Sequence, residues 1–189
     1  MRFAAAVVMS LALAACSEKP APQAAEGRAL AADHHLHIRS SAMGDAAGRL
    51  CGAMADCDAE RLKEAVTGAD AVAALDEADA SQGLVLSMGY FAGMPELEIP
   101  LEDQQALNRS ENEYVAQEVA RFPNRLSGFF SVNPLSDYAQ DEVRYWIADG
   151  RLSGLKLHFT NSDVDLRNED HVAKLSALFD ILGEAGAPV

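Results

Sequence analysis

The sequence predicts an α/β fold in which parallel β-strands alternate with α-helices. Two observations support this prediction: short apolar runs typical of buried strands recur along the chain, and stretches with the spacing of amphipathic helices lie between them. Such alternation indicates consecutive βαβ units. Open parallel sheets and (β/α)8 barrels are both built in this way, but a barrel usually needs about 250 residues, and this chain has 189. The pattern alone leaves two alternatives, an open sheet or an incomplete barrel.

The first elements follow one another in this order. A strand is expected around residues 33–38, followed by a loop that contains Gly, Ala and Cys. Residues 59–79 are rich in alanine and have helical spacing, which predicts one helix or two helices joined near Gly68. The apolar run at residues 83–89 predicts a buried strand. A loop containing Gly and Pro comes next.

The remaining elements continue the alternation. They are a helix at 104–122, a strand at 125–135, a helix at 141–150, a strand at 152–159 and a helix at 169–186. Pro123 ends the first of these helices because proline cannot continue the helical hydrogen bonding, and Gly150 is a typical residue for the end of a helix. The sequence therefore contains four strand and helix units.

The first 16 residues, MRFAAAVVMSLALAAC, have the features of a bacterial signal peptide: Arg2 near the start, an apolar run, and small residues before Cys16. The ending LAAC resembles the lipobox of bacterial lipoproteins. This resemblance implies that residues 1–15 are removed and that Cys16 is acylated, which anchors the protein to a membrane. Ser17 resembles the pattern of lipoproteins sent to the outer membrane, which predicts a location in the cell envelope on its periplasmic face.

Residues 16–29 are rich in Pro and Ala and are typical of a flexible tether, which leaves residues 30–189 as one domain. The apolar content of 49% is that of an ordinary globular domain. The chain has 15 Lys and Arg against 29 Asp and Glu, a formal net charge of −14. This composition argues against a nucleic-acid partner, because phosphate contacts need clustered Lys and Arg.

Two cysteines remain once Cys16 is assigned to lipid, namely Cys51 and Cys57. An exported protein meets an oxidising environment, so the two can form a disulfide that closes a small loop. Two free and partly buried thiols are the alternative. A thiolate metal site is less favoured, because the spacing is not the usual one and no further cysteine is available.

Three of the five histidines lie on the first predicted strand, within the segment ADHHLHI. Alternate residues of a strand share a face, so Asp33, His35 and His37 are expected on one side. His34 is expected on the opposite side. Two neutral imidazoles on one face can share a zinc or similar divalent ion about 2.0–2.1 Å from each nitrogen. The alternative is a polar strand end that binds nothing.

The fourth predicted strand also has a chemically distinct face. Lys156 and His158 share one side of it, where the interior of a barrel would lie, and the apolar residues around them share the other. The alternative is a strand end that reaches solvent, where Lys and His are ordinary. Ser87, Ser131 and Asn133 on the second and third strands add polar groups near the same rim.

Three segments together carry a resemblance to a known family. Asp33-x-His35-x-His37 on the first strand, NEYVAQEVARFPNRLSGFFSVNPL in the middle and GRLSGLKLH on the fourth strand resemble the amidohydrolase-related metal-dependent hydrolases, in their decarboxylase-like branch. The resemblance covers most of the predicted domain. Members of this family are (β/α)8 barrels, so the resemblance implies that this chain is the amino-terminal half of such a barrel, ending after the fourth unit.

The resemblance also implies roles for individual residues. His35 and His37 would bind a divalent metal, usually zinc, and Asp33 would orient them or shape the strand. The further ligands and the aspartate that handles the proton belong to the fifth, sixth and eighth strands of the family. Lys156 matches a lysine common in this branch, so that Lys156 and His158 are candidates for a substrate or metal contact.

The function that the resemblance implies is a metal-dependent hydrolase in which metal-activated water attacks an amide, lactone or ester of a small-molecule substrate. The same branch includes metal-dependent decarboxylases of aromatic or muconate-type acids. A third alternative is a catalytically inactive lipoprotein fragment that binds metal weakly or only a surface partner. A solute-binding lipoprotein of the transport type has little support, because it does not explain the His-x-His strand.

Overall fold

The computed structural model describes residues 32–53 and 56–189. The predicted signal peptide at residues 1–15, the predicted lipidation site Cys16 and the predicted tether at residues 16–29 lie outside the described residues. No helix of the described part combines the length and the apolar composition that a membrane crossing requires.

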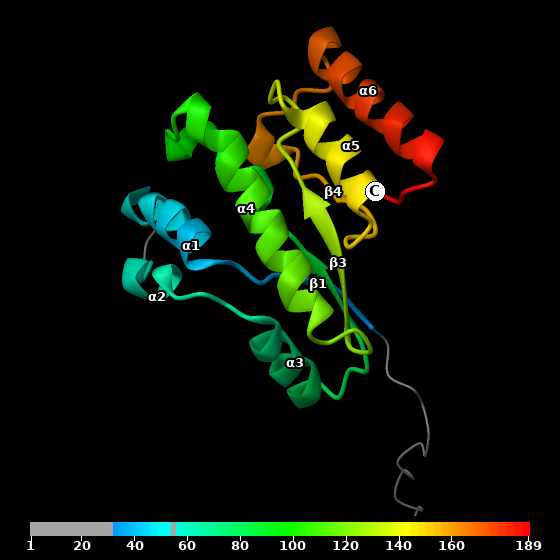
Figure 1. The fold of residues 1–189 in the computed structure, drawn as a ribbon. Coiled ribbons are helices and arrows are strands. Elements are labelled where there is room, and N and C mark those ends of the chain that lie inside the picture. The colour runs from blue at the N-terminus through cyan, green and yellow to red at the C-terminus, as the bar shows by residue number, and fades with distance from the viewer. Residues whose placement is uncertain (1–31, 54–55) are drawn as a thin grey trace, which may run out of the picture.

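Strands and helices alternate along the described chain (Figure 1). The strands are β1 (Asp33–Leu36), β2 (Gly83–Leu86), β3 (Leu126–Ser131) and β4 (Leu155–Lys156). The α-helices are α1 (Ser41–Gly48), α2 (Ala59–Lys63), α3 (Gly68–Glu77), α4 (Leu101–Ala120), α5 (Ala139–Asp149) and α6 (Glu169–Ala185). Short 3-10 helices are η1 (Arg49–Ala53), η2 (Gly89–Gly93), η3 (Pro95–Leu97) and η4 (Thr160–Ser162).

The four strands form one parallel sheet in the order β1-β2-β3-β4, which confirms the predicted α/β fold. Strands that are neighbours in sequence are also neighbours in the sheet. This order is typical of a barrel, whereas a doubly wound open sheet reverses its strand order at a switch point. Among the described strands, β1 and β4 each have one neighbour.

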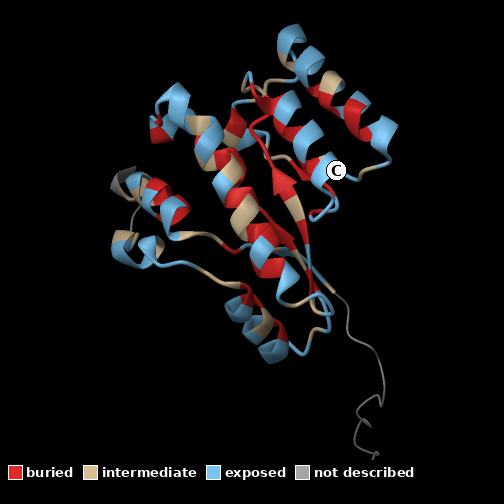
Figure 2. Ribbon diagram, viewed as in Figure 1, coloured by how far each residue is buried: buried red, intermediate tan, exposed pale blue. Residues whose placement is uncertain are grey.

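Helices α3, α4, α5 and α6 pack on one side of the sheet, where the main core lies. Val85, Phe130 and Leu155 come from three adjacent strands and are all buried on this side. Val115 of α4 and Trp146 of α5 belong to the same core, and the Trp146 ring is 6.3 Å from that of Phe130. Figure 2 shows buried residues along β3 and along α4 and α5. Burying a side chain of this size stabilises the fold by about 1.5–3 kcal/mol.

The segment directly after β1 is the helix α1, and the sequence prediction of a loop there was wrong. Ser40 caps this helix, since its hydroxyl accepts a hydrogen bond from the backbone N–H of Met43 (3.1 Å). Met43 and Ala46 are buried on one face of α1. Gly44 lies against α2, because a Cβ at this position would be only 2.2 Å from the carbonyl oxygen of Leu62. In the sequence Gly44 contributed to the prediction of a loop, but in the structure it allows α1 and α2 to pack closely.

The predicted helical stretch at residues 59–79 consists of two helices, as one of the two alternatives proposed. Between them, the backbone of Val66 exchanges two hydrogen bonds with the backbone of Arg39 (3.1 and 2.9 Å). Thr67 then begins α3 with a capping box, in which Thr67 and Asp70 each bond the other's backbone N–H. The helical stretch is therefore interrupted by the backbone pairing of Val66 with Arg39 and by the capping box that begins α3.

The strand β4 is shorter than the predicted strand at residues 152–159, and His158 lies beyond its end. Its pairing with β3 stops where β3 itself ends, since Ser131 is the partner of Lys156. After α6 the chain returns along the other side of β4. There the carbonyl oxygen of Pro188 accepts a hydrogen bond from the backbone N–H of Leu155 (3.0 Å), so residues 187–189 lie where a next strand would pair.

Cys51 and Cys57 are joined by a disulfide in the structure, with their Cα atoms 5.2 Å apart. The bridge connects η1 to the residues just before α2. It therefore closes the loop that leads from α1 into α2.

We predict that replacing both cysteines, by Cys51→Ser with Cys57→Ser, lowers the free energy of unfolding by about 2 kcal/mol, because the bridge restricts the unfolded chain. Urea unfolding of the purified, oxidised protein measures this difference. A reducing agent should lower the stability of the wild-type protein by a similar amount and leave the double variant unchanged. A wild-type transition that does not respond to the reducing agent would contradict the prediction.

Candidate functional site

Four basic side chains gather where the parallel strands end, and they come from the two edge strands of the described sheet. His35 belongs to β1 and His37 follows it, while Lys156 ends β4 and His158 follows that strand. Their charges influence one another: Lys156 and His158 both act to lower the pKa of His37, and His35 acts on the pKa of His158. The chain fold thus places residues more than a hundred positions apart in one cluster.

The His35 and His37 rings meet edge to face, and their Nε2 atoms are 3.1 Å apart. Two nitrogens at this separation, each at a bond length of 2.0–2.1 Å, subtend an angle of about 100° at a shared metal ion. Such an angle fits both tetrahedral and octahedral coordination. Within residues 32–53 and 56–189, no third His, Cys, Asp or Glu completes a metal-binding group with them. The geometry of the pair is compatible with two ligands of a coordination sphere.

The orientation of His37 is fixed by the neighbouring strand. Its Nδ1 lies 2.7 Å from the carbonyl oxygen of Leu86, at the end of β2. Because a carbonyl can only accept, Nδ1 carries the hydrogen, and Nε2 of the neutral ring keeps its lone pair toward His35. Partial burial lowers the pKa of His37 and the charge of Lys156 lowers it further, while the hydrogen bond to Leu86 acts in the other direction. The first two effects favour the neutral form, which is the form that binds metal.

The first strand does not follow the regular alternation that the sequence predicts. Asp33 pairs with Gly83 but Leu36 pairs with Val85, so the register shifts between these two positions. The Asp33 carboxylate accepts a hydrogen bond from the backbone N–H of His35 (2.8 Å) at this irregularity. Of the two roles open for Asp33, the structure shows the one of shaping the strand.

His34 does not lie on the helix side of the sheet, as regular alternation would require. It lines a depression on the open side together with Leu84 and Phe129. The register shift of β1 is the physical reason, because one extra residue in a strand moves the following side chains to the opposite face.

Lys156 is nearly buried, with 9% of its surface exposed. Its ammonium nitrogen lies 5.2 Å from the centre of the Tyr90 ring. Burial lowers the pKa of Lys156. No Asp or Glu of the described residues is within ion-pair distance of it.

His158 stacks on the same Tyr90 ring. Its ring is nearly parallel to that of Tyr90, with the ring centres 5.3 Å apart. The backbone N–H of Asn161 donates a hydrogen bond to His158 Nδ1 (3.2 Å), so the neutral ring carries its hydrogen on Nε2. Burial lowers the pKa of His158, and the charge of Lys156 adds to this effect. The neutral His158 ring can therefore donate a hydrogen bond through Nε2.

Tyr90 was not predicted as a site residue, because it lies in what the sequence presents as a loop. Its backbone N–H donates a hydrogen bond to the hydroxyl of Ser131 (2.9 Å). Two asparagines of α4 hold the backbone of Ser131. The Ser131 N–H donates to Asn112 Oδ1 (2.9 Å). The Ser131 carbonyl oxygen accepts from the Nδ2 atoms of Asn108 and Asn112 (2.9 Å each). A Cβ at Gly89 would lie 3.0 Å from both asparagine side chains, so glycine allows this close approach.

Ser87 and Asn133 also hold this segment in place. The hydroxyl of Ser87 accepts a hydrogen bond from the backbone N–H of Gly89 (3.1 Å), and Asn133 donates one to the carbonyl oxygen of Gly93 (2.7 Å). Both side chains are buried. These two polar strand-end residues support the loop after β2.

Glu111 of α4 holds the turn between β1 and α1. Its carboxyl group is buried and accepts hydrogen bonds from the backbone N–H of Ser40 (3.2 and 3.3 Å) and from the Ser40 hydroxyl. Burial raises the pKa of Glu111 to about 7, although the Ser40 hydrogen bonds and the Arg39 charge act in the other direction. Because Ser40 closely follows His37, this contact also fixes the end of the histidine strand.

We predict that Glu111 makes the protein less stable as the pH rises from about 4.5 to 7. In this interval the folded protein keeps a proton on Glu111 that the unfolded chain has released, so the stabilisation present at low pH is lost on going to higher pH. The loss amounts to about 3 kcal/mol. Urea unfolding across this range should show that the stability of Glu111→Gln, relative to that of the wild type, increases by this amount as the pH rises.

The matched control is Glu113→Gln on the same helix. The pKa of Glu113 is lowered by its hydrogen bonds with Arg151, so its replacement cannot produce a slope of the same sign. Curves of stability against pH that run parallel for the wild type and Glu111→Gln would contradict the prediction.

The comparisons with known proteins identify the fold. No family model and no curated protein sequence matches the chain. A 5-carboxyvanillate decarboxylase from Sphingomonas paucimobilis superposes with a TM-score of 0.60 and 18% sequence identity, over 82% of this chain and 49% of that one. The 5-carboxyvanillate decarboxylase of Novosphingobium aromaticivorans, crystallised with manganese and 3-methoxy-4-hydroxy-5-nitrobenzoic acid, gives a TM-score of 0.61 and 13% identity over 83% and 49% of the two chains.

Both decarboxylases are (β/α)8 barrels of the amidohydrolase superfamily, the group that the sequence resembles. At these identities the match shows a common fold. This chain spans about half the length of each barrel, and its four strands have the sequential order of a barrel wall. The fold is therefore that of one half of a (β/α)8 barrel, four consecutive β/α units of the kind found in these enzymes.

Proposed function

We propose that this chain provides the metal-binding end of the active site of a metal-dependent hydrolase, with a small carbonyl compound as substrate. The observation that carries the proposal is the 3.1 Å separation of the two Nε2 atoms, with the lone pair of His37 directed toward His35. The manganese bound to a structural neighbour supports a divalent ion. We propose zinc for this protein because neutral imidazole nitrogen is one of its usual ligands in proteins.

The residues of the site have distinct roles in this proposal. His35 and His37 hold the ion, and Leu86 orients His37 through its carbonyl oxygen. When bound, such an ion polarises a carbonyl group and lowers the pKa of a bound water to about 7. His158 presents an Nε2–H that can donate to a substrate oxygen. Lys156 holds positive charge at the same rim.

Decarboxylation is the second candidate reaction. It is favoured by the likeness to two 5-carboxyvanillate decarboxylases and by a cation, Lys156, that no carboxylate of the described residues pairs with. The two reactions are separated by assaying the full-length protein against a panel of esters and lactones and, in parallel, against aromatic carboxylic acids. Release of CO₂ without water consumption would assign decarboxylation. A protein that binds metal but turns over neither class would support the inactive alternative.

We predict that His35→Ala combined with His37→Ala weakens binding of zinc and manganese by more than about 100-fold, since removing only an outer partner of a metal ligand costs about 10–100-fold. Metal content after equilibrium dialysis measures this loss. His34→Ala is the matched control, because His34 lies on the same strand and is not one of the two paired imidazoles. Unchanged metal content in the double variant would refute the site.

We also propose that Cys16 is acylated and anchors the protein to the outer membrane, facing the periplasm. The sequence LAAC followed by serine supports this proposal. We predict that Cys16→Ala moves the protein from the detergent-extracted membrane fraction to the soluble fraction of the envelope. A variant that still partitions with the membrane would show that the anchor is not at Cys16.

A further inference from the structure

We propose that Tyr90 is a positioning residue for His158: its ring supports the imidazole, and its hydroxyl supports the turn that holds the imidazole Nδ1. Tyr90 then acts on a substrate through His158 and not by direct contact. The importance of this role for a reaction rests on the proposed function. The positioning itself depends on side chains of this chain alone.

The first contact is made by the Tyr90 ring. It lies at 12° to the His158 ring, with the ring centres 5.3 Å apart. Aromatic rings attract each other when their centres are about 4.5–7 Å apart. Tyr90 is 3% exposed, whereas His158 is only partly buried. The tyrosine therefore provides a fixed surface for an imidazole that can still reach a ligand.

The second contact is made by the Tyr90 hydroxyl, which reaches the turn η4 that follows His158. The Asn161 side chain donates a hydrogen bond to this hydroxyl, which opposes the increase that burial causes in the pKa of Tyr90. The backbone N–H of the same Asn161 donates to His158 Nδ1 (3.2 Å). Asn161 thus connects the tyrosine hydroxyl to the imidazole nitrogen that must carry no hydrogen if Nε2 is to donate.

Tyr90 is itself held firmly, as a positioning residue must be. Its backbone N–H donates to the hydroxyl of Ser131, and its ring meets that of Phe91 edge to face, with the centres 4.9 Å apart. It belongs to a second buried cluster that includes Met43 of α1 and Leu97 of η3. The place of Tyr90 is therefore set by the fold and not by its contact with His158.

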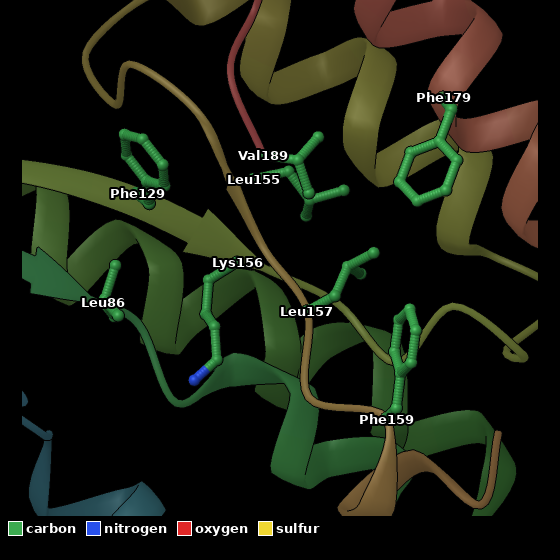
Figure 3. A pocket seen from close by; sticks show the side chains of 8 residues that line it. All are labelled: Leu86, Phe129, Leu155, Lys156, Leu157, Phe159, Phe179 and Val189. Carbon is green, nitrogen blue, oxygen red and sulfur yellow. The ribbon is translucent and has the colours of Figure 1, made fainter. Parts of the chain in front are cut away.

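The Tyr90 ring also lies near Lys156. Figure 3 shows the Lys156 nitrogen directed away from Leu157 and Phe159, and this nitrogen is 5.2 Å from the centre of the Tyr90 ring. The ring therefore contacts both candidate side chains of the fourth strand, whereas the hydroxyl bonds Asn161. Tyr90→Phe consequently keeps both ring contacts and removes only the link to η4.

The test measures hydrogen exchange of the residue 161 amide by NMR, in metal-free protein at about pH 8, where His158 is neutral. We expect Tyr90→Phe to lower the protection of this amide about fivefold, which is the effect of one ordinary hydrogen bond. Asn161→Ala should lower it by a similar factor. The double variant should lose no more than either single variant, because both changes remove the same bond.

The His158 ring protons provide a second readout. The neighbouring ring shifts their NMR signals, so Tyr90→Phe should largely keep these shifts and Tyr90→Leu should lose them. The matched control is the backbone N–H of Asp165, which donates to His171 Nδ1 (3.1 Å) and so makes the same kind of bond elsewhere. Its protection should be unchanged in all of these variants.

The outcomes separate this inference from the proposed function. The combined variant His35→Ala, His37→Ala should keep the wild-type protection at Asn161, and failure to bind metal would count against the proposed function alone. Unchanged protection at Asn161 in Tyr90→Phe, or losses that add in the double variant, would overturn the inference. An equal loss at Asp165 would also overturn it, because the tyrosine would then stabilise the fold in general.

Discussion

The hydrogen bond from His37 Nδ1 to the Leu86 carbonyl oxygen is made where β1 and β2 end side by side. A parallel sheet brings the carboxyl ends of its strands to one edge, so a ring on one strand can reach a backbone group of the next. This contact decides which nitrogen of His37 carries the hydrogen, and hence which nitrogen faces His35. The chemistry available at the edge therefore depends on correct pairing of the first two strands.

Helix α4 packs against the sheet, and its polar side chains hold the same edge through hydrogen bonds. Glu111, Asn108 and Asn112 are fully buried, and buried polar groups must find hydrogen-bond partners. Their partners are backbone groups at the ends of β1 and β3, through Ser40 and Ser131. A shift of α4 would leave these groups unpaired, at a cost of about 1–3 kcal/mol each. One helix thus holds both the turn after the histidines and the loop that carries Tyr90.

Much of the fold follows from patterns visible in the sequence, because apolar periodicity and the positions of Pro and Gly report directly on strands, helices and their ends. The proximity of His35 and His37 could also be predicted, because two imidazoles two positions apart on a strand share a face. The Leu86 carbonyl could not be found, because a backbone group leaves no trace in residue identity. Asn108 and Asn112 of α4 were not predicted as residues that support the site. Their separation by four positions puts both on one face of the helix. The irregularity of β1 depends on a pairing register that single-sequence patterns do not contain.

The charge distribution links the parts of the site to one another. The chain is strongly acidic, yet its pKa shifts at the carboxyl ends of β1 and β4 are produced by burial and by neighbouring cations. No carboxylate of the described residues lies beside Lys156, so its charge adds to burial in lowering the pKa of His37, which favours the neutral imidazole. Burial and the charge of Lys156 therefore act, together with the Leu86 contact, on the protonation of His37.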